Sequence, residues 1–310
     1  VSTFAGAGGS SLGYSMAGFR ELLAVEWDDN AVATFKANFP GVPVYHGDIA
    51  KLGVEQALSM SGLKPGELDV FDGSPPCQGF STAGKRIMDD PRNQLFREFV
   101  RLLAGLRPKV FVMENVSGMV KGKMRLIFVD ILRELKACGY VVSARLLNAM
   151  YFGVPQSRQR MIFIGVRDDL GIAPTHPGAM AYPVVVRGAL CGVSAEPAPR
   201  LSPGLVAIVG RIPQWGDGGD VTGGNYFGTK RIGWDRPSRA IIKEMTGTRT
   251  ALIHPDEPRA VTGAEAKRIG GWPDSYQIGG HYKQIMTRIG NSVPPLFMRS
   301  IAQHIRREIL

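Results

Sequence analysis

Cysteine is scarce in this chain, with Cys77, Cys138 and Cys191 as the only three thiols among 310 residues. They form no CxxC pair and no cysteine–histidine cluster with the spacing of a zinc site. We therefore expect neither a disulfide framework nor a metal centre. Such cysteine usage is typical of a reducing setting, and we expect a cytoplasmic protein.

Long apolar runs are missing as well. No stretch approaches the ~20 apolar residues that a membrane span requires, which predicts no membrane partner. The first residues, VSTFAGAGGSSLG, lack the basic start and apolar centre of a signal peptide. They have the pattern of a strand followed by a tight turn, so we expect a short native start to precede them.

Acidic side chains are also few compared with basic ones. The chain has 27 acidic against 37 basic side chains, a formal net charge of +10 and a pI near 9.7. A basic balance favours a polyanionic partner, because lysine and arginine neutralise phosphates and release counterions. The length allows a large core and, on size alone, roughly two domains.

Strand-like and helix-like segments alternate through the first half of the chain. Strands are expected at 1–4, 22–27, 44–47, 68–73, 110–114, 141–147 and 161–166, and helices at 10–19, 30–38, 94–106 and 123–138. Strands separated by helices predict an α/β, doubly wound, mostly parallel sheet of Rossmann-like type. Ligands of such sheets bind at the carboxyl ends of the strands.

The amino-acid composition changes after Arg167. Residues 171–235 are rich in glycine and proline, as in PTHPG and WGDGGDVTGGNYFG, and few helical periods occur there. Helical patterns return at 264–270 and 295–310. From residue 171 on, we expect a second, smaller, loop-rich domain with short strands.

Three consecutive strand ends carry residues suited to a nucleoside. FAGAGG follows the first strand as a glycine turn, Glu26, Trp27 and Asp28 end the second, and Asp48 closes the third. A carboxylate after the second strand can accept from both ribose hydroxyls, and a tryptophan offers its face to adenine. These strand ends contain no arginine that could bind phosphate groups. S-adenosylmethionine, which has no phosphates, needs none. The alternative is that the acids cap helices and that the tryptophan is buried.

The fourth expected strand runs into the segment GSPPCQGFSTAGKR. Pro75 and Pro76 stiffen the approach to Cys77 and remove backbone donors. A cysteine held at a strand end before a glycine-rich, basic loop is typical of a nucleophile. A buried structural cysteine is the ordinary alternative, and it suits Cys138 and Cys191 better than Cys77.

These segments together resemble the signatures of the DNA (cytosine-5) methyltransferase family, in the family's order along nearly the whole chain. They are FAGAGG, EWD, the GD that ends at Asp48, GSPPCQGFS, ENV at 114–116, QSRQR at 156–160 and GNSVPP at 290–295. The resemblance implies a catalytic and S-adenosylmethionine-binding domain at 1–170 plus 283–310. It implies a target recognition domain at 171–282.

Catalytic roles follow from the resemblance. The thiolate of Cys77 would add to carbon 6 of cytosine and make carbon 5 nucleophilic, and Glu114 would hold ring nitrogen 3 and the exocyclic amine. Arg160 would bind the cytosine carbonyl, and Arg158 would help to place the thiol loop or a phosphate. Asn115 would fix loop geometry, and Gln78 completes the catalytic set. The cytosine must be flipped out of the duplex, and 78–93 is the expected closing loop.

The resemblance also implies the donor-binding residues. The set is Phe4, Ala5, Gly6, Ala7, Gly9, Glu26, Trp27, Asp48, Ile49, Pro76, Leu95, Asn291, Ser292 and Val293. The bound methyl donor is expected to be S-adenosyl-L-methionine.

Double-stranded DNA is the implied substrate. The expected DNA contacts are Ser81, Lys85, Arg86, Gln156, Lys230, Arg231, Arg236 and Arg239. Arginine, lysine and glutamine side chains read base edges in the major groove, and Gln214 and Trp215 belong to the same candidate region. A monomer of prokaryotic or viral origin, associated with the nucleoid and paired with a cognate restriction endonuclease, fits the family.

Three alternatives stay open on the sequence alone. A tRNA cytosine methyltransferase would use the same catalytic parts, but its Cys-Phe-Thr signature is not evident here. A catalytically silent DNA-binding regulator would have lost the nucleophile or donor residues, whereas Cys77, Glu114 and Trp27 are present. A small-molecule methyltransferase would need neither the basic balance nor the second domain.

Overall fold

The structure is a computed structural model, and it describes residues 1–76, 91–120, 124–194, 196–245, 247 and 250–310. The chain divides into two compact units. The first contains 1–147, 159–178 and 299–310, and the second contains 148–158 and 179–298. Compared with the predicted boundaries, the second unit also takes in 148–158 and 283–298, whereas 171–178 belongs to the first unit.

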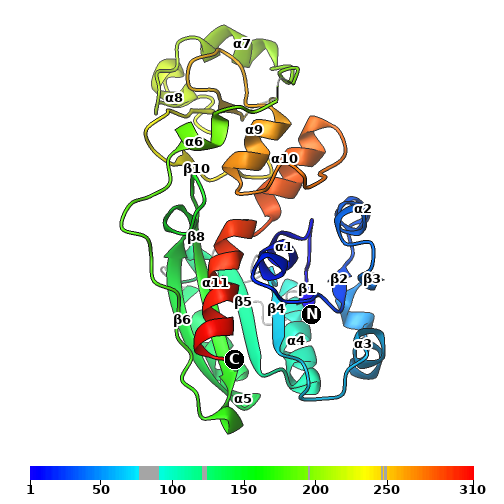
Figure 1. Cartoon of the computed structure of the whole chain (residues 1–310). Helices are drawn as coiled ribbons and strands as arrows, with labels where there is room; N and C mark the ends of the chain where they lie inside the picture. The colour runs from blue at the N-terminus through cyan, green and yellow to red at the C-terminus, as the bar shows by residue number, and fades with distance from the viewer. Residues whose placement is uncertain (77–90, 121–123, 195, 246, 248–249) are drawn as a thin grey trace. The chain divides into compact units, whose positions relative to one another are not determined.

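The first unit is built on a seven-stranded sheet in the order β3-β2-β1-β4-β5-β8-β6, which can be followed in Figure 1. The strands are β1 (Ser2–Thr3), β2 (Ala24–Glu26), β3 (Val44–His46), β4 (Val70–Gly73), β5 (Val110–Val116), β6 (Tyr140–Asn148) and β8 (Gln159–Arg167). The strands from β3 to β5 pair in parallel. The predicted α/β, mostly parallel sheet is therefore confirmed.

One strand departs from parallel pairing. β8 runs antiparallel to β5, with Glu114 opposite Ile162 and Val116 opposite Arg160. Along the chain β8 follows β6, and no α-helix lies between them. The antiparallel pair places the end of β5 beside the start of β8.

Helices connect the parallel strands. They are α1 (Gly9–Met16), α2 (Asp29–Asn38), η1 (Ile49–Lys51), α3 (Val54–Ser61), α4 (Pro91–Leu106), η3 (Ser117–Val120) and α5 (Met124–Ala137), with η5 (Asp168–Leu170) after β8. The short α3 is absent from the sequence prediction. The part of α11 (Pro295–Glu308) from Arg299 onward belongs to this unit, and Arg306 donates to the carbonyl of Ala17 at the end of α1 at 2.8 Å.

Phenylalanines form the core between the sheet and α4. Phe71 of β4 stacks on Phe99 of α4 at 4.8 Å between ring centroids, and Phe99 meets Phe111 of β5 edge-on at 6.1 Å. All three rings are fully buried. A β-carbon on Gly165 of β8 would overlap the ring of Phe111. Glycine at this position is what lets the ring lie across two strands.

The second unit has more helix than the sequence indicates. Its helices are η4 (Ala149–Tyr151), α6 (Val186–Leu190), α7 (Pro203–Val209), α8 (Gly218–Thr222), α9 (Gly263–Ile269), α10 (Tyr282–Asn291) and the start of α11. Its strands in the described ranges are the two-residue β7 (Gln156–Ser157), β9 (Lys230–Arg231), β10 (Ser238–Arg239) and β11 (Leu252–Ile253). The predicted short strands and long loops are present, but helices α6 to α8 and α10 were not expected.

Within the described residues, no helix is both long enough and apolar enough to cross a membrane.

A buried histidine makes the first unit sensitive to acid. His176 is 8 % exposed, and its Nε2 atom lies 3.2 Å from the hydroxyl of Ser143 in β6. Burial, followed by the charge of Arg145, lowers the pKa of His176 to about 4. The unfolded chain therefore binds the proton more readily between this pKa and the ordinary value near 6.5. Stability is fully present above pH 6.5 and is lost as the pH falls toward 4.

His176→Gln should flatten this dependence. Because glutamine does not titrate, the variant should lose on the order of 1–2 kcal/mol less unfolding free energy than the wild type between pH 7 and pH 5. Urea unfolding at several pH values measures the difference. Parallel curves for the wild type and His176→Gln would contradict the prediction.

Candidate active site

The turn after β1 brings its backbone to the end of β2. Phe4, Gly6 and Gly8 have left-handed backbone angles, with φ of 54°, 55° and 84°, which glycine adopts without side-chain strain. The bend points the Gly6 amide at Glu26, whose Oε2 atom accepts its hydrogen at 2.7 Å. The glycine turn and the acidic strand end are thus joined directly.

Backbone amides hold the carboxylate of Glu26 in place. Its Oε1 atom accepts from the amides of Trp27 and Asp28, both at 2.9 Å. The residue is 8 % exposed. A carboxylate oxygen has two lone-pair directions, so Oε2, which accepts from Gly6, has a second direction for a ligand hydroxyl.

Trp27 differs from its acidic neighbours. Asp28 accepts from the amide of Ala31 at 2.8 Å and caps α2, and Asp48 accepts from the amide of Ala50 at 3.0 Å and caps η1. The interpretation of these two acids as helix caps is therefore correct. Trp27, however, is 77 % exposed. An indole left in solvent beside a fixed carboxylate offers a planar apolar face to a ligand.

The other residues of the predicted donor set lie in several environments. Ala5, Ala7 and Ile49 are buried, Gly9 begins α1, and Leu95 of α4 packs against the core. Pro76 is exposed. The Asn291–Val293 segment belongs to the second unit, with Asn291 exposed and Ser292 and Val293 buried. Their predicted contact with the donor therefore remains a prediction.

Glu114 and Arg160 form an ion pair where β5 and β8 meet. The Nε atom of Arg160 lies 2.6 Å from Oε1 of Glu114, and the two side chains are 17 % and 10 % exposed. The antiparallel register places both residues at the same end of the strand pair. Charge-assisted contacts of this length are strong when water is largely excluded. Two groups predicted to act on one cytosine are therefore in direct contact.

Asn115 ties this corner to the end of the neighbouring strand β4. Its side-chain amide donates to the carbonyl of Pro75 at 3.1 Å. This contact fits the predicted role of Asn115 in setting loop geometry, because Pro75 directly precedes Pro76 and Cys77. Five of the predicted site residues lie outside the described residues: Cys77, Gln78, Ser81, Lys85 and Arg86.

Comparison of the sequence with models of protein families identifies the family of this chain. The family model described as C-5 cytosine-specific DNA methylase matches residues 1–186 and 212–307. The chain belongs to this family. It is a DNA (cytosine-5) methyltransferase.

Individual relatives agree with the family assignment. The Type II methyltransferase M1.HphI of Haemophilus parahaemolyticus is 33 % identical over 98 % of this chain and 86 % of its own. The Type II methyltransferase M.XorII of Xanthomonas oryzae pv. oryzae is 30 % identical over 100 % and 84 %. A crystal structure described as a prophage-encoded DNA modification methyltransferase of E. coli has a TM-score of 0.78 and 26 % identity, over 99 % of this chain and 98 % of that one.

Two polar residues of the QSRQR segment are buried in the second unit of the methylase. Arg158 is 3 % exposed and donates to the carbonyls of Ile241 at 3.1 Å and Gly290 at 2.9 Å. Gln156 is 2 % exposed and accepts from the amide of Ile241 at 3.1 Å. Arg158 is expected to help place the thiol loop or a phosphate and Gln156 to contact DNA, but these contacts favour a supporting role for both side chains within the second unit.

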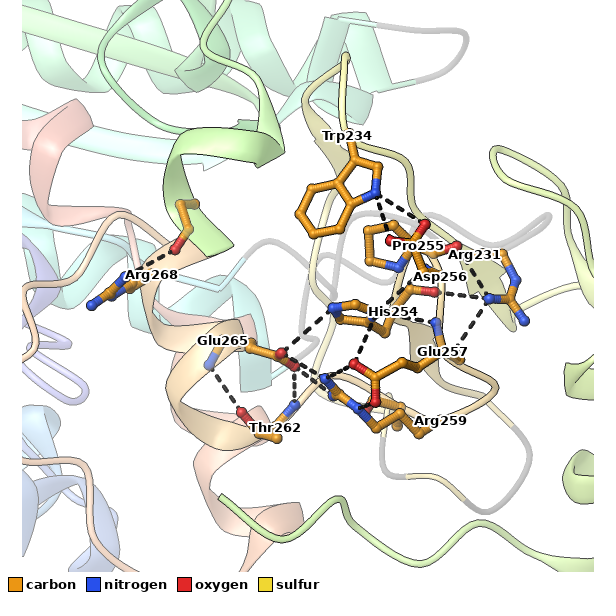
Figure 2. Close-up of polar contacts among 12 residues, drawn as sticks. Arg231, Trp234, His254, Pro255, Asp256, Glu257, Arg259, Thr262, Glu265 and Arg268 are labelled. Carbon is orange, nitrogen blue, oxygen red and sulfur yellow. Dashed lines mark hydrogen bonds and ion pairs between the residues drawn. The ribbon is translucent and has the colours of Figure 1, made fainter. Parts of the chain in front are cut away.

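Lys230 and Arg231 are also occupied by the methylase's own fold. The guanidinium of Arg231 donates to the carbonyls of Val209 at 2.6 Å, His254 at 3.0 Å and Pro255 at 3.2 Å, and the residue is 6 % exposed. Figure 2 shows Arg231 beside His254 and Pro255. Lys230 pairs with Asp217 at 2.5 Å. Contact with DNA is therefore better suited to Arg236 and Arg239, which are exposed.

A buried carboxyl group of the methylase escaped the sequence analysis. Asp72 of β4 is 3 % exposed and accepts from the hydroxyl of Tyr14 in α1 at 3.3 Å. Burial, followed by the charge of Glu21, raises the pKa of Asp72 to about 7. The signal was an aspartate inside the apolar run LDVFDG. This polar contact joins β4 to the helix that follows the glycine turn.

Proposed function

We propose that the enzyme methylates carbon 5 of a flipped-out cytosine within a specific sequence of duplex DNA, using S-adenosyl-L-methionine and a covalent adduct with Cys77. The observation that carries this proposal is the Glu114–Arg160 pair at 2.6 Å. A carboxylate and a guanidinium at one strand end are complementary to the amine and nitrogen 3 of cytosine on one side and to its carbonyl on the other. Asn115 connects this pair to the strand that leads to Cys77.

The residues at the ends of β1 and β2 fit S-adenosylmethionine. The exposed face of Trp27 suits an adenine, and the carboxylate of Glu26, fixed beside Gly6, suits the ribose hydroxyls. Asp48, exposed at the end of β3, can accept from the adenine amino group. When bound, this donor supplies an electrophilic methyl group. The assignment to Trp27, Glu26 and Asp48 rests on these contacts and exposures.

The chain's own residues act on the cytosine ring. The thiolate of Cys77 forms a bond to carbon 6, and the electron pair of the broken double bond makes carbon 5 nucleophilic. Glu114 holds nitrogen 3 and favours its protonation, while Arg160 donates to the carbonyl oxygen. After carbon 5 is methylated, its proton passes to a solvent base, and the electron pair of that carbon–hydrogen bond restores the double bond to carbon 6. The carbon–sulfur bond breaks, its electrons return to the Cys77 thiolate, and Glu114 takes back the proton of nitrogen 3.

The remaining partners follow from the family. Because carbon 6 is inaccessible within a stacked duplex, the cytosine must leave the helix at a cost of a few kcal/mol. A cognate restriction endonuclease that acts on the same site is proposed as the biological partner, since the relatives named above are Type II methyltransferases. We further propose a cytoplasmic monomer.

The proposed function is tested by incubating the enzyme with plasmid DNA and S-adenosylmethionine, followed by bisulfite sequencing. Protected cytosines should appear at one recurring sequence and should be absent without the donor. A parallel incubation with transfer RNA tests the alternative substrate. Methylation of the RNA with none of the plasmid would contradict the proposal.

A further inference from the structure

Arg236 lies over the indole of Trp215 in the second unit. Its guanidinium carbon is 5.4 Å from the ring centroid, and Arg236 is exposed. Cation–π stacking of this kind restrains a planar guanidinium while leaving its N–H edge accessible. In the described part of the chain, no ion pair engages Arg236. The side chain is therefore oriented by an aromatic platform and not by a carboxylate.

The platform itself is held firmly. Trp215 has a left-handed φ of 71°, which is strained for a bulky residue and persists only where the surroundings enforce it. Its amide donates to the carbonyl of Arg231 at 3.1 Å. A β-carbon on Gly233 would lie 2.5 Å from the indole, so the ring rests directly on that backbone.

A second arginine of the same unit provides an internal contrast. Arg187 lies over Trp234 with its guanidinium carbon 5.6 Å from the ring centroid. Its Nη2 and Nε atoms, however, donate to Asp235 at 2.8 Å and 3.2 Å. Both arginines stack on an indole, but among the described residues a carboxylate occupies the N–H edge of Arg187 only.

Gln214, directly before Trp215, is oriented as a hydrogen-bond acceptor. Its Nε2 atom donates to Asp256 at 3.1 Å, and the indole nitrogen of Trp234 donates to both oxygens of the same carboxylate at 3.0 Å, as Figure 2 shows for Trp234. A carboxylate only accepts. The amide of Gln214 must therefore turn its NH₂ toward Asp256, which leaves its oxygen to accept from a partner.

We propose that Arg236 reads a guanine of the recognition sequence in the major groove, an inference that rests on the proposed function. A restrained guanidinium edge matches the N7 and O6 acceptors of guanine, and the acceptor of Gln214, the residue before Trp215 in the sequence, matches the N4 donor of a cytosine. A contact with a DNA phosphate would need neither the aromatic platform nor the fixed edge. The recognised sequence therefore contains a G·C pair that Arg236 specifies.

The test compares the wild type with Arg236→Lys on duplexes that contain the sequence found by bisulfite sequencing. Lysine keeps the charge but loses the planar fork, so kcat/KM on this sequence should fall about 10- to 100-fold. Each guanine is then replaced in turn by 7-deazaguanine, which lacks the N7 acceptor. At one position the replacement should weaken the wild type more than it weakens Arg236→Lys, because lysine lacks the planar fork that spans N7 and O6. Arg187→Lys is the matched control and should retain wild-type sequence preference.

Two results would overturn the inference. One is wild-type kcat/KM for Arg236→Lys on every duplex. The other is an equal loss on all sequences, with no position at which 7-deazaguanine affects the wild type more than Arg236→Lys, which is the behaviour of a phosphate contact. In both cases the wild type still methylates DNA, so the proposed function stands. A wild type that methylates no DNA would remove the proposed function and the inference together.

Discussion

Cys77→Ser is expected to lower the rate of methyl transfer at least about 10³-fold while leaving duplex affinity close to that of the wild type. A thiol has a pKa near 8.5 and supplies a usable fraction of thiolate at neutral pH, whereas a serine hydroxyl does not. The substitution exchanges sulfur for oxygen and changes little in size, so binding of DNA and donor should persist. Incorporation of labelled methyl groups and gel-shift titration measure the two quantities separately.

The other two cysteines are the controls. Burial and the charge of Glu134 raise the pKa of the Cys138 thiol, which donates to the Glu134 carbonyl at 3.4 Å, and Cys191 is exposed. Cys138→Ser and Cys191→Ser should both remain active. With DNA containing 5-fluorocytosine, the wild type and both controls should form a stable adduct, and Cys77→Ser should form none. An adduct in the Cys77→Ser reaction would refute the assignment.

The arrangement at the ends of β1 and β2 could be predicted because its signals are local. A glycine turn and an acidic strand end are visible as short segments, and parallel pairing brings consecutive strand ends to one edge of the sheet. The hydrogen bond from Gly6 to Glu26 is a direct result of that geometry. The sequence did not decide whether Trp27 is exposed. Asp28 and Asp48 can cap their helices whether the indole is exposed or buried.

The buried arginines could not be predicted in the same way. A guanidinium has five N–H donors, and it can satisfy carbonyls from segments far apart in the sequence, as Arg158 does for Ile241 and Gly290. Arg231 does the same for Val209 and His254. The packing of the loops decides which arginine donates to backbone carbonyls and which faces solvent. The residue type alone does not distinguish the two cases.

The helices of the second unit were missed for a reason of length. α7 (Pro203–Val209) has 7 residues, less than the window of about 11 that a helical period needs to be recognised. A different signal was available: Ser202 accepts from the amide of Leu205, and Pro203 occupies the first turn. Serine followed by proline is a typical helix start. Cap residues would thus have found a helix that periodicity could not.

Glu114→Gln should lower the rate of methyl transfer by about 10²- to 10⁴-fold, the range for loss of a positioned proton-transfer group. Glutamine keeps the shape of the side chain but has no charge to hold Arg160 at 2.6 Å and no carboxylate to share a proton with ring nitrogen 3. The step that suffers is activation of the ring, so adduct formation with 5-fluorocytosine DNA should slow in proportion to turnover. Single-turnover methylation and the rate of adduct formation measure both.

A second ion pair of the first unit provides a control that distinguishes a loss of catalysis from a loss of stability. Glu98 pairs with Arg101 on α4, also at 2.6 Å and with side chains 20 % and 37 % exposed, so Glu98→Gln removes a similar contact away from the proposed site. Both variants should unfold at slightly lower urea concentrations, because each leaves an arginine with fewer partners. Only Glu114→Gln should lose catalysis. If its rate stayed within about threefold of the wild type, the pair would be a structural contact and ring activation would need another acid.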